Sequence, residues 1–419
     1  MKLSSITPNE AYDWINQRDN LFESFIPIEP EKKFNASSRS IFVVNSRGLE
    51  TSRDSWIYNS SKMVVERNIQ SSIEFFNKQV ADYQNIKDKG ISVNNYISYD
   101  STKISWTSSL MPHVRNGNHA MFEQKFRVGL YRPFFKQHLY FGEKMIHRRG
   151  QFDNFFPTPQ SKNLVICVGA ISKNGLSALI SNGIVDLHFN GDTQCFPLYY
   201  YEKVDKGQLG LFDSTEDEYI RRDAISDFIL ERARQEYGPK TTKEDIFYYV
   251  YGILNCEDYK KKFSSDLKKM LPRIPLVANI KDFQSFVKSG EKLASLHLNY
   301  EDGPFCPDIL IKGMEHGNYR VEKMRFLIKN DKRSILYNAN IRIENIPQLA
   351  YEYTINGKSA IEWLMEKYQV SIHPESQILN DPNSWSEDPK YILNLMNKII
   401  QLSLESLRII RSMPRLLFE

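Results

Sequence analysis

Apolar residues recur at helical spacing in one long stretch of the N-terminal half. Their separations of four and three residues place them on one face of a helix over residues 61–83, with Ser60 or Ser61 as its N-cap. The positions are Val65, Ile69, Ile73, Phe76, Val80 and Tyr83. Such a stripe packs either on its own domain or on a partner helix, and the pattern alone fits both.

The rest of the first half is dominated by short β-type segments. Residues 40–45 and 56–58 predict a hairpin, and Thr7 before Pro8 predicts a short helix through about Asn16. Between Tyr96 and Tyr201, glycine, proline and asparagine separate runs rich in β-branched and aromatic residues. These runs predict strands at 126–131, 138–141, 164–168, 177–180, 185–189 and 196–201.

Beyond an acidic segment at residues 205–218 the pattern becomes mainly helical. A capping box of Thr241 and Glu244 predicts one helix start, and Gly238-Pro239 predicts the end of the preceding helix. The expected helices cover 223–237, 241–254, 258–270, 282–288, 291–298, 359–368 and 390–411, and a β pair covers 319–328 and 334–341. We therefore predict an α+β fold with a β-rich N-terminal lobe (1–218) containing the long helix, and a mainly helical C-terminal lobe (219–419).

Composition narrows the class of protein. A chain of 419 residues with 41% hydrophobic and 25% charged residues is typical of a folded protein with two lobes. The net charge of +4 is small, so any nucleic-acid surface must be a local basic patch. The four cysteines form no CxxC pair and no apolar run approaches the ~20 residues of a membrane span, which predicts buried free thiols and a cytoplasmic protein.

The sequence motifs that mark several enzyme classes are missing. An adenine methyltransferase needs a (D/N)PP(Y/F) string and a glycine-rich turn, but the sequence has no Pro-Pro dipeptide and no GxG. Gly357-Lys358-Ser359 imitates a phosphate-binding loop, yet Glu352 occupies its first glycine position, so we expect an ordinary turn. Ser265 and Lys268 match an acyl-transfer spacing but fit a solvated helix face better. We expect no catalytic residue, cofactor or metal ligand, although a nuclease without a recognisable motif stays open.

Several aromatic-rich strings occur in one order along nearly the whole chain: WIYN (56–59), LYRPF (130–134), FPTP (156–159), CFPLYYY (195–201), DIFYYVYGIL (245–254), KMLPRIP (269–275) and LHLNYE (296–301). Together they resemble the C-terminal specificity region of type ISP restriction-modification enzymes. The resemblance implies a non-catalytic module that recognises double-stranded DNA beside an adenine methyltransferase and a motor. The alternative is a scaffold that docks to the methyltransferase without touching DNA.

Residue chemistry indicates where DNA contacts are expected. Phosphate binding needs Lys or Arg, and base reading needs forked donors or amides in projecting loops. Three clusters in the β-rich half supply them, although ordinary polar loops would explain each residue about as well. The candidates are Lys103, Arg115 and Asn116; Lys136, Arg148 and Arg149; and Lys173 and Asn174.

These candidates have different expected roles. Lys173 and Asn174 sit in a glycine-containing loop suited to base reading, whereas Arg148 and Arg149 suit the DNA backbone. Arg132 is flanked by apolar residues and has a second interpretation as an internal paired arginine. The lysines of residues 260–269 fit a solvated helix face or a phosphate contact.

Overall fold

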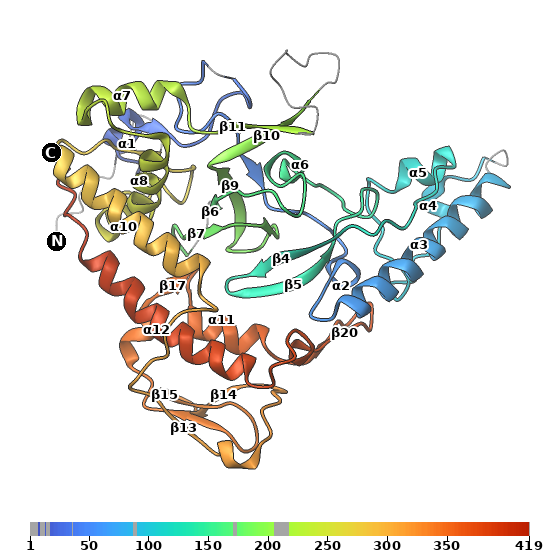
Figure 1. The fold of residues 1–419 in the computed structure, drawn as a ribbon. Coiled ribbons are helices and arrows are strands. Elements are labelled where there is room, and N and C mark those ends of the chain that lie inside the picture. The colour runs from blue at the N-terminus through green and yellow to red at the C-terminus, as the bar shows by residue number, and fades with distance from the viewer. Residues whose placement is uncertain are drawn as a thin grey trace.

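The computed structural model describes residues 7–8, 13, 17–35, 37–86, 90–170, 174–204 and 218–418. Helices and open sheets alternate along these residues, and the predicted α+β class is confirmed (Figure 1). The short helix expected at residues 7–16 lies largely outside the described part of the chain, as does most of the acidic segment at 205–218.

Two four-stranded sheets form the centre of the N-terminal half. The first is antiparallel, in the order β2 (Ser46–Arg47), β9 (Asp192–Pro197), β6 (Val165–Ala170), β7 (Ala178–Ser181). The second has the order β3 (Tyr58–Asn59), β5 (Phe135–Tyr140), β4 (Phe126–Arg132), β8 (Ile184–Val185), and its β4–β8 pair is parallel. Cys167 and Cys195 face each other across β6 and β9, and all four cysteines are buried free thiols, as predicted.

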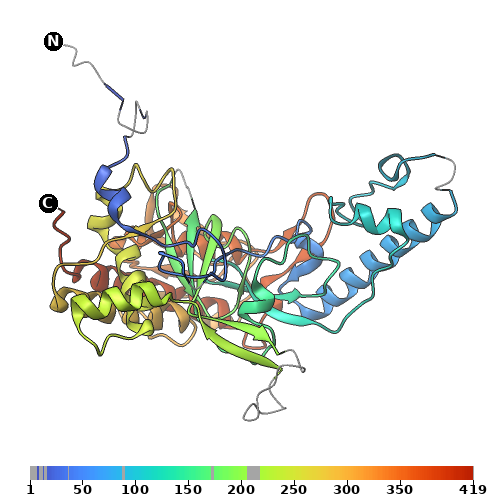
Figure 2. The same cartoon turned by 90° about the horizontal axis from the view of Figure 1, so that it is seen from above.

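The predicted long helix is confirmed as α3 (Lys62–Gln84). With α4 (Val93–Tyr96) and α5 (Met111–Asn116) it forms an arm that projects from the body of the molecule (Figures 1 and 2). Asn77 exchanges two hydrogen bonds with the backbone of Ala120, and Gln84 donates to the carbonyl of Val114. The apolar stripe of α3 is therefore covered by its own chain along the arm.

A buried arginine holds the base of this arm. Arg53 is only 2% exposed and precedes the short helix α2 (Asp54–Ile57). Its guanidinium donates to the carbonyls of Ser105 and Met145 and to the hydroxyl of Thr107. Burial lowers the pKa of Arg53 to about 10. One side chain thus ties together three loops that are distant in sequence.

Helices form the layer beside these sheets. They are α7 (Asp227–Tyr237), α8 (Lys243–Asn255), α9 (Glu257–Lys262), α10 (Ile280–Leu298), α11 (Ala360–Lys367) and α12 (Tyr391–Arg411). The capping box of α8 is formed by Thr242 and Asp245, not by the expected Thr241 and Glu244, because the Thr241 hydroxyl donates to the carbonyl of Gly238.

The two helices expected at 282–288 and 291–298 are one continuous helix, α10. Gly290 is a contact point instead of a break: a Cβ there would lie 2.0 Å from the carbonyl oxygen of Tyr248 on α8. Gly252 is equally restricted from the other side, by the carbonyl oxygen of Phe286 at 2.6 Å. These two glycines allow the backbones of α8 and α10 to touch.

The C-terminal half contains more β structure than the predicted lobe. A four-stranded sheet has the order β13 (Leu310–Lys312), β16 (Arg342–Glu344), β15 (Asp331–Leu336), β14 (Arg325–Ile328). Two hairpins follow: β17 (Thr354–Ile355) with β18 (Lys358–Ser359), and β19 (Ser371–Ile372) with β20 (Leu379–Asn380). Asn356 and Gly357 have positive φ between β17 and β18. The segment that resembles a phosphate-binding loop is therefore a hairpin turn, as predicted.

The remaining strand pairs join the two halves. The strands flanking the acidic segment, β10 (Tyr199–Lys203) and β11 (Tyr219–Asp223), pair with each other, and β1 (Ile26–Pro27) pairs with β12 (Arg273–Ile274). The short helical elements are α1 (Asn20–Ser24), α6 (Phe152–Phe155), η2 (Met314–His316), η3 (Gln348–Glu352) and η4 (Pro382–Ser384). The division into lobes at residue 218 stays a prediction.

Three further local predictions were wrong. The helix expected at 258–270 ends at Lys262, as α9. Residues 40–45 hold only an isolated bridge at Phe42, and the strand lies at β2. Trp56 and Ile57 belong to α2, because the carboxylate of Asp54 and the buried Arg53 hold this segment in a helical turn before β3 begins. The string WIYN therefore marks a helix-to-strand junction.

A fully internal histidine joins three elements of the helical layer. Nδ1 of His297 lies 2.6 Å from the Tyr251 hydroxyl, and Nε2 lies 3.0 Å from Ser406 Oγ and 2.9 Å from the Tyr353 hydroxyl. Burial, with a smaller contribution from Lys260, lowers the pKa of His297 to about 3. The imidazole is therefore neutral in the folded protein at pH values where a solvated histidine is charged.

This lowered pKa predicts a pH-dependent stability. A base whose folded pKa lies below its unfolded pKa stabilises the fold above pH 6.5, and this contribution is lost as the pH falls towards 3. Between pH 7 and pH 4 the wild type should lose about 3 kcal/mol that His297→Gln does not lose, since the glutamine does not titrate. Urea unfolding of both proteins at several pH values measures the difference. A constant gap between them across this range would contradict the neutral buried state.

Candidate nucleic-acid interface

The β4–β5 hairpin separates its side chains into two sets. Alternate residues of a strand point to opposite faces of a sheet. Lys136 and His138 of β5 line a groove on one face, whereas Phe135 and Gln137 line a cavity on the other. The two faces differ in charge, and the groove is the basic one.

The groove, of about 660 Å³, is lined only by cationic, apolar and neutral polar side chains. Among the described residues that form its wall there is no carboxylate. The lining residues are Lys62, Phe126, Arg127, Val128, Leu130, Lys136, His138, Phe156, Thr158, Pro159, Ser161, Asn182, Gly183 and Ile184. We define this set as the basic groove. An anion entering it meets no like charge on the wall.

Arg127 is its most unusual member. Its Nη1 donates to the carbonyl of Phe126, but its buried Nε has no hydrogen-bond acceptor in the described part of the chain. Burial, followed by the neighbouring charge of Arg149, lowers the pKa of Arg127, and the weaker influence of the Asp153 charge only partly opposes this. A half-buried guanidinium without a carboxylate partner is costly, and an anion in the groove would relieve that cost.

Three further residues add charge or hydrogen-bonding capacity. The exposed Lys62 at the start of α3 lies 5.2 Å above the Phe126 ring, and no described carboxylate forms an ion pair with it. The His138 ring lies 4.8 Å from the Trp385 ring at a tilt of 41°, and burial together with Lys62 lowers the pKa of His138. Lys136 is paired with Glu301, so its charge is already largely compensated. Lys62 and Arg127 are thus the cations most available to a ligand.

Of the residues selected from the sequence, only Lys136 lines the basic groove. Arg149 has an internal role: its guanidinium forms two hydrogen bonds with Asp153, donates to the carbonyl of Phe141 and stacks 3.7 Å from the Phe141 ring. Arg148 is 63% exposed and pairs with Glu50 at 3.1 Å. The two arginines that the sequence suggested as a joint phosphate contact therefore differ: Arg149 is structural and Arg148 is exposed.

The other candidates lie elsewhere. Lys103, Arg115 and Asn116 are exposed on the arm, with Arg115 and Asn116 at the end of α5 away from the β4–β5 hairpin (Figures 1 and 2). Asn174 donates to the backbone oxygen and to the side-chain oxygen of Asn356 in the β17–β18 turn. Lys173 lies outside the described residues.

The alternative interpretation of Arg132 is the one the structure bears out. Arg132 Nη1 lies 2.6 Å from Asp186 Oδ1, and its guanidinium stacks 3.9 Å from the Tyr131 ring. Among the lysines of residues 260–269, Lys262 pairs with Asp19 and Lys269 with Asp13, which agrees with a solvated face. Lys260 is the exception, because burial lowers its pKa to about 8.

The sequence reasoning missed Lys62, Arg127 and His138. Arg127 lies in the strand predicted at 126–131. His138 begins the strand predicted at 138–141, but the observed strand begins at Phe135, so Lys136, two residues before His138, shares its face. No sequence signal brings Lys62 of α3 beside them, because that neighbourhood depends on the tertiary packing of α3 against β5.

No cluster of three or more His, Cys, Asp or Glu side chains in the described residues has a metal-binding arrangement. None of the helices in those residues is long and apolar enough to cross a bilayer.

The chain is similar to one protein family and to several solved structures. Residues 40–395 match the family model described as the Type ISP C-terminal specificity domain. A nuclease-deletion mutant of the Type ISP restriction-modification enzyme LlaGI, in complex with a DNA substrate mimic, is 36% identical over 98% of this chain, with a TM-score of 0.84. The ATP-dependent Type ISP enzyme LlaBIII bound to DNA is 37% identical over 99% of it, with a TM-score of 0.85.

A third structure, the DrdV–DNA complex, shares the fold at 21% identity, with a TM-score of 0.81 over 99% of this chain. The present chain corresponds to only 36%, 26% and 40% of the LlaGI, LlaBIII and DrdV chains, respectively. No match was found among curated proteins.

The contacts of the two neighbouring arginines predict different effects of their removal. Arg149→Ala removes a bidentate ion pair, a carbonyl hydrogen bond and an aromatic stack, and should lower the free energy of unfolding by about 1–3 kcal/mol. Arg148→Ala removes one exposed ion pair and should cost less than about 0.5 kcal/mol. Urea denaturation of both variants tests the difference, and equal losses would refute the internal role of Arg149.

Proposed function

This chain belongs to the Type ISP C-terminal specificity domain family, and from this premise we propose that it recognises target sequences in double-stranded DNA. The observation that carries the proposal is the basic groove on the β4–β5 hairpin, a carboxylate-free wall with two cations that lack a described ion-pair partner. DNA backbones are bound by Lys and Arg, and anionic side chains would oppose that contact. The DNA-bound state of the similar LlaGI and LlaBIII structures supports the same function.

The groove supplies positions for both kinds of DNA contact. Lys62 and Arg127 reach the surface as donors for phosphate oxygens, while His138, Thr158 and Asn182 can exchange hydrogen bonds with base edges. The exposed Val128 offers apolar contact to a base or sugar. We therefore propose that the groove and its rim hold the duplex.

The chain acts here as a recognition part and works with partners. LlaGI and LlaBIII are restriction-modification enzymes, and LlaBIII is described as ATP-dependent. We propose that an adenine methyltransferase and a motor supply the chemistry, in the cytoplasm, while this chain supplies the sequence preference. Contacts by Lys103, Arg115, Asn116, Arg148, Lys173 and Asn174 remain part of the proposal, as additions to the groove.

The first test is direct binding of duplex DNA to the purified chain. Random duplex should bind with a dissociation constant of roughly 10⁻⁴ to 10⁻⁶ M at physiological salt, and the affinity should fall steeply as salt rises. No detectable binding even at low salt would favour the docking-scaffold alternative. Cleavage of the DNA that requires a divalent metal would instead favour the nuclease alternative.

The second test removes the two available cations. Lys62→Gln with Arg127→Gln should weaken binding of every duplex about equally and reduce the slope of log affinity against log salt by up to ~2, because two fewer counterions are displaced. A fluorescence anisotropy titration at four or more salt concentrations gives both values.

A matched control removes the same charge elsewhere. Lys312→Gln with Arg333→Gln alters two exposed, ion-paired cations of the β13–β16 sheet. This variant should keep the wild-type salt slope. If the control weakens binding as much as the groove variant, the groove is not the DNA surface and only the net charge matters.

A further inference from the structure

The basic groove continues into a second groove beside it. Pro159, Ser161 and Asn182 line both, so the two grooves share one rim. The second groove has a volume of about 590 Å³ and extends to the ribbon formed by β10 and β11 (Figure 1). We call it the ribbon groove. An elongated ligand in the basic groove can therefore continue along the surface into the ribbon groove.

The ribbon groove carries two cations without a carboxylate partner. Lys162 and Arg221 are exposed and line this groove, and no described carboxylate forms an ion pair with either of them. Glu244 is the one carboxylate among the described lining residues, and it accepts a hydrogen bond of 2.6 Å from the Tyr199 hydroxyl. The two positive charges are therefore available to an anion.

Aromatic stacking holds Arg221 in position. Its guanidinium lies 4.2 Å from the centre of the Tyr199 ring. Tyr199 is itself anchored, because the Asn163 side chain accepts a hydrogen bond from its backbone N–H at 3.0 Å and donates one to its carbonyl at 2.7 Å. A cation whose position is fixed before binding loses less conformational freedom when a ligand arrives. Arg221 is therefore preorganised to bind an anion.

Strand geometry separates Arg221 from its neighbour Arg222. Across the ribbon, Arg221 is paired with Tyr201 and Arg222 with Tyr200. Successive residues of a strand point to opposite faces, and of these two arginines it is Arg221 that lines the ribbon groove. Arg222 is ion-paired with Glu202 at 3.1 Å. Two adjacent arginines with the same chemistry thus have different surroundings.

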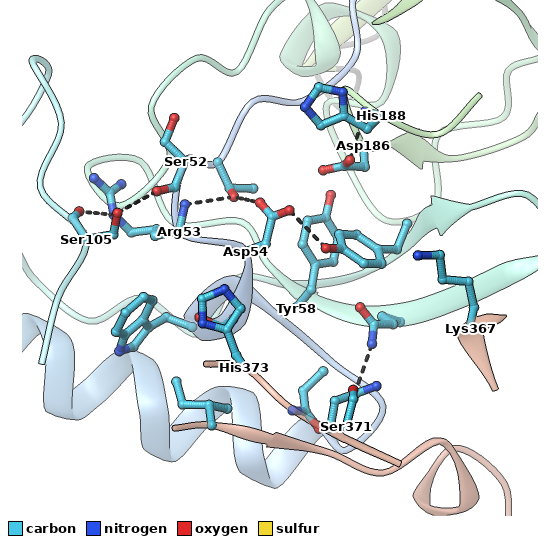
Figure 3. Close-up of a pocket in the computed structure, with 18 of the residues that line it drawn as sticks. Ser52, Arg53, Asp54, Tyr58, Ser105, Asp186, His188, Lys367, Ser371 and His373 are labelled. Atoms are coloured by element: carbon cyan, nitrogen blue, oxygen red, sulfur yellow. Dashed lines mark hydrogen bonds between the residues drawn. The ribbon is translucent and has the colours of Figure 1, made fainter. Parts of the chain in front are cut away.

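The opposite face of the β4–β5 hairpin has no equivalent cations. It borders the cavity lined by Phe135 and Gln137, and Figure 3 shows the two described cations of that lining, Arg53 and Lys367. The Arg53 guanidinium donates to backbone carbonyls, and Lys367 is ion-paired with Glu366. Neither side chain is left for a phosphate, so the available charges next to the basic groove are those of the ribbon groove.

We propose that duplex DNA bound in the basic groove continues along the ribbon groove, where Arg221 and Lys162 bind phosphate oxygens of its backbone. This second contact region presupposes the proposed function and extends the DNA surface beyond the β4–β5 hairpin. Each DNA strand carries one phosphate per ~3.4 Å of helix axis, so a duplex that passes the shared rim brings further phosphates over these cations. A guanidinium can bind a phosphate through two parallel hydrogen bonds. Because the contact is to the backbone, it is independent of base sequence.

The experiment measures binding of a labelled random-sequence duplex, long enough to cover both grooves, to the purified 419-residue chain at several salt concentrations. Arg221→Gln should weaken binding roughly 5- to 10-fold near about 0.1 M salt and lower the slope of log affinity against log salt by about 1, because one fewer counterion is displaced. Lys162→Gln should have a similar effect. Fluorescence anisotropy gives both the affinity and the slope.

Two further variants test the cause of the loss. Arg222→Gln is the matched control, because it removes the same charge at the adjacent position on the other face of the ribbon. It should keep the wild-type affinity and slope. Arg221→Lys keeps the positive charge and should recover most of the slope that Arg221→Gln loses, which a purely structural role of Arg221 would not produce. Thermal unfolding checks that each variant folds.

The outcomes separate the ribbon contacts from the proposed function. If Arg221→Gln keeps the wild-type affinity and slope while Lys62→Gln with Arg127→Gln weakens binding, the ribbon groove is not part of the DNA surface. Equal weakening by Arg222→Gln would mean that only the net charge matters, and it would also overturn the assignment. If the wild type binds no duplex, the proposed function and the ribbon contacts are both wrong.

Discussion

Alternation along β5 is the constraint that brings the Lys136 and His138 side chains to the basic groove. A strand sends successive side chains to opposite faces, so the same short hairpin carries Lys136 and His138 on one side and Phe135 and Gln137 on the other. A slip of one residue in the register would exchange these sets. The pairing of β5 with both β3 and β4 fixes that register from two sides, and Gly129 allows the Tyr58 and Leu139 side chains to pack directly against β4. The basic side chains of β5 are thereby kept on one face of the sheet, and its apolar and amide side chains on the other.

The separation has an electrostatic consequence that the composition hides. A net charge of +4 on 419 residues predicts no strong attraction to DNA. On the hairpin, however, Lys136 and His138 of β5 face a groove whose described lining includes no carboxylate. A duplex that approaches this face meets no like charge on the wall of the groove. Local sorting of charge by strand geometry, and not excess of charge, gives the proposed DNA surface its direction.

The sequence predicted where helices and strands lie much better than it predicted which of them pack against each other. Long periodic segments such as α3 and α12, and strands such as β4 and β6, were placed within a few residues, because their patterns are local. The continuous helix α10 was predicted as two helices, at 282–288 and 291–298, and the reason for a glycine at position 290, the backbone of Tyr248, lies on another helix. Arg149 was selected as a phosphate contact because its partner Asp153 and the Phe141 ring are not visible as partners in the sequence. The family resemblance carried the functional prediction, and the individual contact residues did not follow from it.

The arginines show why residue type alone is a weak guide to a binding surface. Arg53, Arg132 and Arg149 each use the guanidinium fork to hold the fold together, through carbonyls, a buried carboxylate and an exposed carboxylate respectively. Arg127 has the same chemistry but lacks a described carboxylate partner, and part of its desolvation cost stays uncompensated. A folded protein keeps such a group where a ligand supplies the missing charge. A structural arginine is therefore distinguished from one that binds a ligand by whether its guanidinium already has partners within the protein. Only the packed structure shows those partners.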